Sequence, residues 1–176
     1  RLRKEHLEQE LAAARPVAPS HDEKQIRQWA RRQLTSLADA LEGRRDDEAR
    51  RVLTRLSAMV QGGVLANRFP DNYHSSDASL WFIHALFSYR RHWGDDPFME
   101  TMKPVIKSIL EEYPHSGVAS LDHNLISVVP KSTWMDTEFT PREGKPVEIN
   151  ALWVHTLSEA DAMGIETPVS PESAHE

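Results

Sequence analysis

The segment from Lys131 to Trp153 gathers side chains that could act on a sugar. It reads KSTWMDTEFTPREGKPVEINALW and combines two tryptophans with carboxylates, an arginine and an amide. Sugar hydroxyls require paired hydrogen-bond donors and acceptors, and the apolar faces of pyranose rings stack on indole rings. The candidate contacts in this segment are Trp134, Asp136, Arg142, Glu148 and Asn150.

A second polar loop, earlier in the chain, carries a similar mixture. It reads LANRFPDNYHSSD and supplies the candidates Asn67, Arg68, Asp71, Tyr73 and Asp77. Hydrolysis of a glycosidic bond needs one carboxylic acid to protonate the leaving oxygen, and a second carboxylate to activate water or attack. Asp136 suits the first role, because the neighbouring Trp134 would desolvate its carboxyl group and favour the protonated form.

Several of the carboxylates also have purely structural interpretations. Asp136 could cap a turn or form an ion pair with Arg142, which would then fasten the loop. Asp77 could cap the helix that follows it, or it could contact the sugar. Glu148 could simply complement the positive end of a helix dipole.

The remaining aromatic and basic side chains are open to the same question. Trp81 and Trp153 lie about one turn into the helices that follow the two loops. Aromatic residues on helices usually pack, so the core is the favoured place for both. Trp134, which lies in a loop, is the better sugar platform, and Arg68 could be a structural pin.

Composition excludes several classes of function. The net charge of −6 argues against general binding to nucleic acids or to anionic membranes, since either would require a basic face. The chain has no cysteine, which fits a reducing compartment such as the cytoplasm. It also has no apolar run of membrane-spanning length. Nine histidines are present, but no HExxH motif, so we expect no metal and no cofactor.

Hydrophobic periodicity predicts an all-α fold of about five helices. Residues 1–20 read as a lead-in or linker, residues 21–164 as the folded domain, and residues 165–176 as a disordered tail. Residues 117–130 predict a small β-hairpin or an extended excursion, and Pro104 predicts the first turn of a helix. The expected helices cover 22–42, 46–61, 77–93, 101–113 and 147–163. The antiparallel helical hairpins would carry their long loops at one end.

Four stretches of the chain carry a family resemblance. NRFPD, YHSSDASLWF, TWMD and TPREGKPVEINALW resemble the C-terminal amylo-α-1,6-glucosidase domain of glycogen-debranching enzymes. The resemblance runs from about Gln28 to Met163 and is closest in the loops. It implies an (α/α)6 barrel, of which this chain holds only a part.

The resemblance also implies an activity. The aspartate of the TWMD motif, here Asp136, would be the general acid in the hydrolysis of the α-1,6-linked glucose left at a branch point, with inversion. The family's general base is a glutamate much later in the barrel, beyond these residues. A GRD motif is common before NRFPD, and Arg32 or Gln33 stands where its aspartate would be.

Two functional hypotheses therefore remain. The first is a piece of a debranching α-1,6-glucosidase that binds an α-glucan such as glycogen or a limit dextrin. The second is a non-catalytic glycan-binding or helical interaction module that keeps the family's loops. A partial ring of helices would expose apolar faces, so the partner in either case could be the remainder of the barrel or a second copy.

Overall fold

The computed structural model describes residues 46–68, 72–139 and 141–175. The expected lead-in over 1–20, the helix over 22–42, and Asp71 lie outside these ranges. Within the described residues, every helix is too short or too polar to cross a membrane.

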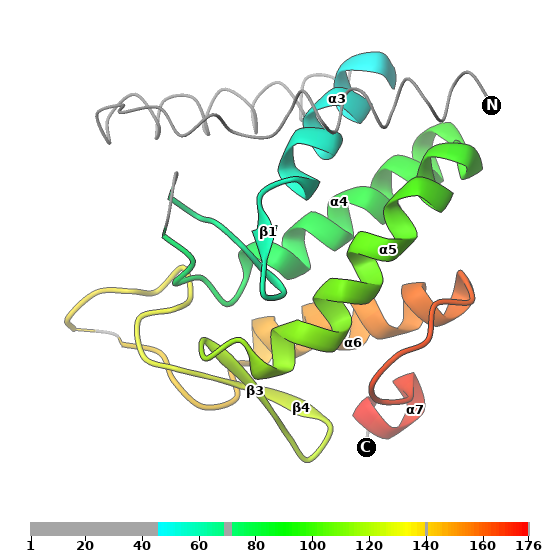
Figure 1. Cartoon of the computed structure of the whole chain (residues 1–176). Helices are drawn as coiled ribbons and strands as arrows, with labels where there is room; N and C mark the ends of the chain where they lie inside the picture. The colour runs from blue at the N-terminus through cyan, green and yellow to red at the C-terminus, as the bar shows by residue number, and fades with distance from the viewer. Residues whose placement is uncertain (1–45, 69–71, 140, 176) are drawn as a thin grey trace.

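Helices dominate the described fold, and the only sheets among these residues are two small hairpins (Figure 1). This confirms an all-α fold, consistent with part of an (α/α)6 barrel. The helices are α3 (Asp46–Ser57), α4 (Ala78–Trp93), α5 (Asp96–Glu112), α6 (Val147–Ala162) and α7 (Pro171–His175), with a 3-10 turn η1 (Tyr113–His115). The strands are β1 (Val60–Gln61) paired with β2 (Val64–Leu65), and β3 (Ala119–Asp122) paired with β4 (Leu125–Val128).

Helix α4 lies at the centre and packs against α3, α5 and α6. Its Leu80, Ile83 and Leu86 are fully buried, which explains why its sequence is apolar on most sides. The helix ends at Gly94, as predicted, because the left-handed φ of +65° there suits glycine. The chain then reverses into α5, whose buried face includes Met102.

Two predicted helix boundaries are wrong. Helix α5 begins at Asp96 rather than Thr101, because the Asp95 carboxylate accepts a hydrogen bond from the Phe98 N–H at 3.2 Å and caps the helix. Pro104 therefore lies inside the helix, at an exposed position, and not in its first turn. Helix α3 ends at Ser57, four residues before the expected end, because the chain after it turns into the β1–β2 hairpin.

The end of the chain is folded, so the prediction of a disordered tail over 165–176 is wrong as far as His175. Ile165, Val169 and Ala174 are buried in the main core, and α7 packs on α6. The reversal needed for this packing occurs at Gly164, where φ is +67° and the next amide bonds back to the Ala160 carbonyl at 2.9 Å. Three apolar side chains at wide spacing are enough to hold a polar segment on the domain.

A buried tyrosine joins the N-terminal end of α3 to the turn between α4 and α5. The single proton of the Tyr89 hydroxyl is shared between the carboxylates of Asp46 and Asp95. Arg50 forms ion pairs with the same two carboxylates. Burial first, and then the bonds to Asp46 and Asp95, raise the pKa of Tyr89 far above the ordinary 10.

We expect stability to fall steeply at alkaline pH because of Tyr89 and Tyr113. Burial, with a smaller effect of the Asp77 charge, also raises the pKa of Tyr113 far above 10. The unfolded chain loses both phenolic protons near pH 10, whereas the folded chain keeps them. A raised folded pKa therefore stabilises below pH 10 and loses this contribution as pH rises, by about 1.4 kcal/mol per pH unit per tyrosine. Urea unfolding between pH 9 and pH 11.5 measures the slope.

The matched control is the variant with Tyr89→Phe and Tyr113→Phe. It starts from lower stability because it lacks the hydroxyl bonds, but its free energy of unfolding should fall less steeply with pH. A slope equal to that of the parent chain would contradict the assignment of the alkaline loss to these two hydroxyls.

Candidate functional site

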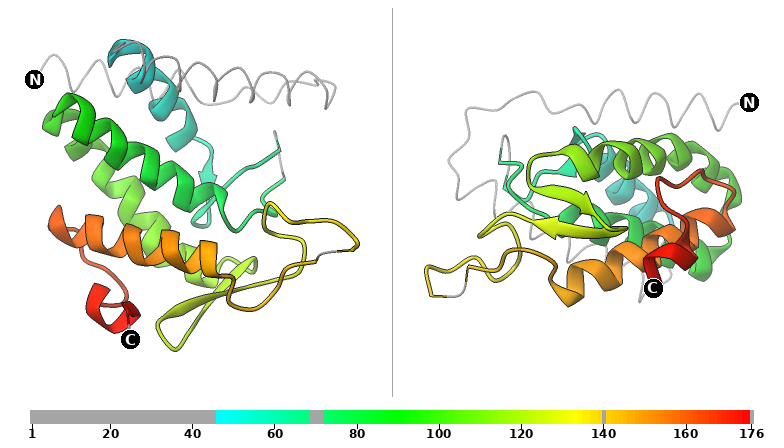
Figure 2. Two further views of the ribbon diagram at one scale, coloured as in Figure 1. Left: turned by 180° about the vertical axis from the view of Figure 1, so that it is seen from behind. Right: turned by 90° about the horizontal axis from the view of Figure 1, so that it is seen from below.

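The two loops that carry the candidate residues lie side by side. The Ser76 amide donates to the Ser132 carbonyl at 2.7 Å, and the Ser76 hydroxyl donates to the same carbonyl at 3.0 Å. His74 Nε2 lies 3.3 Å from the Pro130 carbonyl oxygen. Figures 1 and 2 show both loops at the end of the molecule where α4 and α6 begin. We call residues 66–77 and 129–146 together the rim.

Hydrogen bonds at the base of the two loops fasten the rim to the helical core. The buried Tyr113 hydroxyl donates to the Ser76 carbonyl at 2.5 Å. Val128 and Gly144 exchange two backbone hydrogen bonds, of 2.7 and 3.0 Å, which close the base of the second loop. Hydrogen bonds to backbone carbonyls thus set the relative position of the two loops.

An ion pair in the second loop joins Arg142 to Glu148 and not to Asp136, which was the partner that one interpretation of the sequence suggested. Arg142 Nη1 lies 2.7 Å from Glu148 Oε1 and 3.4 Å from Met135 Sδ. Arg142 therefore pairs with Glu148 at the start of α6 and holds the loop against that helix. The pair is partly buried, so Glu148 does more than complement the helix dipole.

Asn150 fastens the β3–β4 hairpin to α6. Its Oδ1 accepts a hydrogen bond from the Ile126 amide at 2.7 Å, and its Nδ2 donates to the carbonyls of Ile126 and Pro146 at 3.0 Å each. Both Nδ2 protons are engaged with main chain. The structure thus gives Asn150 a positioning role, and leaves it one acceptor lone pair for a ligand.

Replacing Asn150 by alanine should destabilise the fold by about 2–3 kcal/mol. The change removes three hydrogen bonds and leaves the Ile126 amide and carbonyl without their partner in a largely buried place. Thermal or urea unfolding followed by circular dichroism measures the loss. The control is Asn67→Ala, because Asn67 is an exposed asparagine of the other loop, and its cost should stay within about 0.5 kcal/mol. Equal costs would refute the positioning role.

Asp136 and the aromatic residues around it are exposed. Asp136 lies in the projecting part of the loop, and Trp134 and Phe139 are 67% and 95% exposed. The expected desolvation of Asp136 by Trp134 is therefore wrong for the described structure, because water reaches both side chains. The same exposure leaves two aromatic rings available to a ligand beside one carboxylate.

The first loop differs from expectation in one respect. Asp77 precedes α4, but its side chain makes no capping hydrogen bond and instead accepts one from the Ser75 hydroxyl at 2.6 Å. Asp77 therefore occupies the N-cap position of α4, as one interpretation predicted, but its carboxylate does not bond to the helix amides. Asn67 and Arg68 have exposed side chains, and an antiparallel bridge between the backbones of Arg68 and Asn72 narrows the loop.

The two helix-borne tryptophans have different environments. Trp153 is fully buried and donates to the Asn124 carbonyl at 3.2 Å, so the core interpretation is confirmed. Trp81 is 53% exposed, so the same interpretation is wrong for it. The sequence did contain a signal, since Trp81 shares a helical face with the polar residues His84 and Ser88 at spacings of three and seven.

Next to Trp81, two histidines face each other between α4 and α6. The rings of His84 and His155 have centroids 5.2 Å apart, and Trp81 meets His84 edge-on at 5.6 Å. Burial, then the proximity of His155 and Arg91, lower the pKa of His84 against a weaker opposing effect of Glu159. His84 is therefore a neutral imidazole at pH 7. Among the described residues, no group of three or more potential ligands could hold a metal ion.

Tyr73 separates from the other candidates. It lines an open pocket with residues of the β1–β2 turn and the end of α5, and Asp136 lines neither this pocket nor the neighbouring one. Tyr73 and Asp136 therefore do not share either of the two pockets found among the described residues.

The comparisons with known proteins give one result. No curated protein and no solved structure matches the chain. A family model described as amylo-alpha-1,6-glucosidase matches residues 18–173, which include the whole rim and every described helix up to α6. Because this match covers most of the sequence, the chain belongs to the amylo-alpha-1,6-glucosidase family.

Proposed function

We propose that this chain contributes one wall of an α-1,6-glucosidase site that acts at the branch points of an α-glucan such as glycogen. The observation that carries the proposal is the junction of Ser76 with Ser132, which places the loop of Asp136 beside the loop of Tyr73. The family match supports the reaction class, and the exposed rings of Trp134 and Phe139 support a sugar ligand.

In this proposal Asp136 protonates the glycosidic oxygen, and the reaction inverts the configuration at the anomeric carbon. Trp134 stacks on the glucose ring, and the Arg142–Glu148 pair holds the loop so that Asp136 keeps its position. An inverting site needs a second carboxylate about 6.5–9.5 Å from the acid, with a water molecule between them. Glu148 is engaged by Arg142, so we place this base on a further segment outside the two loops.

Because Asp136 is exposed, something must cover its carboxyl group before it can act as a general acid. A general acid must hold a proton until it transfers it to the leaving oxygen, and exclusion of water favours the protonated form of a carboxyl group. A further wall, formed by the remainder of the barrel or by the bound glucan, must therefore exclude water from Asp136. Because the chain has no cysteine, we place this activity in a reducing compartment, the cytoplasm.

The test is glucose release from a limit dextrin by the chain together with the remainder of the barrel, which would supply the base and the further wall. We expect Asp136→Asn to lower the rate at least about 100-fold, because an amide cannot supply the proton. The control is Glu138→Gln, which removes an exposed carboxylate two residues away and should leave the rate unchanged. Equal rates in the parent chain and in Asp136→Asn would refute the catalytic role.

A second function is favoured by the same exposure. If the chain binds the dextrin and releases no glucose, it is a glycan-binding module that retains the family's loops. Trp134→Ala should then weaken dextrin binding, whereas Asp136→Asn should leave it unchanged, and this pattern separates the two functions.

A further inference from the structure

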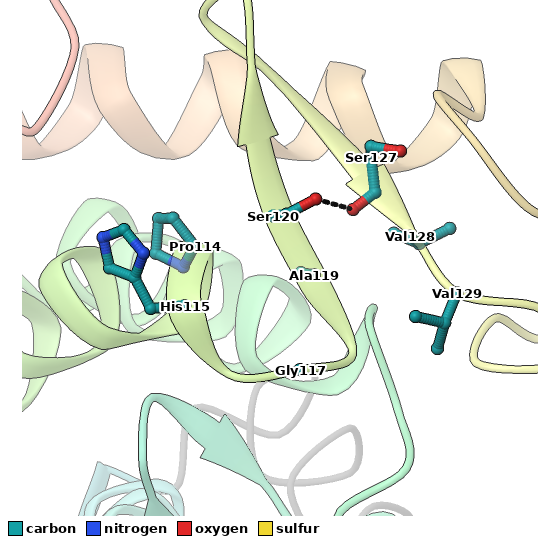
Figure 3. A pocket seen from close by; sticks show the side chains of 8 residues that line it. All are labelled: Pro114, His115, Gly117, Ala119, Ser120, Ser127, Val128 and Val129. Atoms are coloured by element: carbon teal, nitrogen blue, oxygen red, sulfur yellow. Dashed lines mark hydrogen bonds between the residues drawn. The ribbon is translucent and has the colours of Figure 1, made fainter.

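Two open pockets adjoin on the surface around the C-terminal end of α5. The first, of about 460 Å³, lies among the β1–β2 turn, the end of α5 and Tyr73. The second, of about 410 Å³, lies between η1 and the β3–β4 hairpin, and Figure 3 shows its lining side chains. His115 lines both pockets, so they adjoin at this residue, and we call the two together the α5-end groove.

The lining of the α5-end groove changes in character along its length. The first pocket presents the Gln61 amide, the Glu111 and Glu112 carboxylates and the Tyr73 ring. The second is lined by two serines, of which Ser120 donates to the Ser127 carbonyl at 3.5 Å, by the half-buried Val129, and by the edges of the largely buried Pro114, Ala119 and Val128. A sugar polymer offers the complementary surface, because each ring has a hydroxyl-bearing edge and two apolar faces.

The charge of the groove restricts the ligand. Of the described residues that line it, the charged ones are the carboxylates Glu111 and Glu112, and no lysine or arginine lines either pocket. Phosphate groups and nucleic acids would be repelled. Glu112 accepts a hydrogen bond from Ser108 through one oxygen, at 2.7 Å, and its other oxygen remains available to a hydroxyl.

The walls of the groove are preorganised. Gly63 packs so closely on η1 that an added Cβ would lie 2.2 Å from the Tyr113 amide nitrogen. Val129 donates to the Val118 carbonyl at 3.2 Å, which holds the hairpin side. A fixed groove loses little conformational entropy when a ligand binds, so modest polar contacts suffice.

We propose that the α5-end groove is a second α-glucan binding site, separate from Asp136, that holds a neighbouring chain of the branched polymer. The inference rests on the proposed function for the class of ligand, and on the groove itself for the place. Its role is to retain the polymer while a branch point lies at the rim.

The test is a titration of the ¹⁵N-labelled 176-residue chain with maltoheptaose, a linear α-1,4-glucan, followed by amide chemical shifts. We expect shifts at residues 111–120 and 127–129. The double variant Glu112→Ala with Ser120→Ala, both exposed, should weaken this binding about tenfold, as expected for the loss of polar contacts to a charged group and a hydroxyl. The matched control is Glu100→Ala with Ser173→Ala, which lie outside both pockets and should bind like the parent chain.

The other outcomes are distinct. Shifts confined to residues 131–146, and unchanged by the double variant, would overturn the groove and leave the rim function standing. Shifts in the groove without glucose release from a limit dextrin would support the groove and count against the catalytic proposal. Absence of shifts, or equal groove shifts with tetralysine, which would assign the carboxylates to a cationic partner, would overturn the inference.

Discussion

Replacing Gly63 by alanine should destabilise the fold by about 2–5 kcal/mol. Gly63 has φ of +75°, where a side chain costs about 1–2 kcal/mol. The new Cβ would also lie 2.2 Å from the Tyr113 nitrogen and 2.7 Å from the Glu112 carbonyl carbon, and overpacking against backbone costs about 1–3 kcal/mol more. The turn cannot retreat easily, because its carbonyl accepts a hydrogen bond from the Ser79 hydroxyl at 2.9 Å.

Gly62 provides the matched control for this prediction. It is the other residue of the two-residue turn between Gln61 and Val64, has φ of +54°, and has open space where its Cβ would lie. Gly62→Ala should therefore cost only the backbone strain, about 1–2 kcal/mol. Urea unfolding of both variants measures the difference, and equal losses would show that the close packing on η1 contributes nothing.

The second large effect is expected at Trp153. Its side chain is fully buried, lies 6.2 Å from the Tyr113 ring between centroids, and bonds the Asn124 carbonyl through its indole nitrogen. Trp153→Ala should cost about 3–5 kcal/mol, because it leaves a large cavity and an unpaired carbonyl. Against the 5–15 kcal/mol that usually stabilises a domain, such a loss unfolds a substantial share of the molecules at moderate temperature.

Two further variants define the origin of that loss. Trp153→Phe keeps much of the apolar volume and should cost clearly less than Trp153→Ala. Trp81→Ala removes the same residue type from a half-exposed position on α4 and should cost within about 1 kcal/mol. If Trp153→Ala and Trp81→Ala had the same melting temperature, the difference in burial between the two indole rings would not explain the loss of stability.

The elements that the sequence predicted well are those with local signals. Helices α4 and α6 have strong apolar content and end near Gly94 and Gly164, both of which have positive φ. The β3–β4 hairpin was also predicted, and His123 and Asn124 at its turn occupy left-handed conformations. Propensity and turn chemistry suffice for such elements, because the decisive interactions lie within a few residues.

The boundaries that failed depend on distant contacts. Pro104 favours a helix start, but α5 begins on the N-terminal side of this proline, at Asp96, because Phe98 and Met99 are buried in the core. The tail is polar on average, and only its packing on α6 shows that Val169 belongs to the core. Tertiary packing overrides local preference in both places.

The candidate site shows the same division. Its residue types could be recognised from the sequence, because tryptophan, carboxylates and arginine within one loop are a compositional signal. The contact between the loops could not, since Ser76 and Ser132 are 56 residues apart and both bonds between them end on a backbone carbonyl, which no side-chain pattern encodes. The exposure of Asp136 was missed for a related reason, because neighbours in sequence need not cover each other in space.

The bonds that join the two loops determine where this chain can accept substitutions during evolution. Since the junction is formed by Ser76 and His74 with the carbonyls of Ser132 and Pro130, substitutions between residues 134 and 139 leave its groups in place and should leave the scaffold intact. Saturation libraries at those positions could therefore redirect preference among branched polysaccharides while the molecule stays folded. In such a protein, the residues that maintain the fold differ from the residues that determine which ligand is preferred.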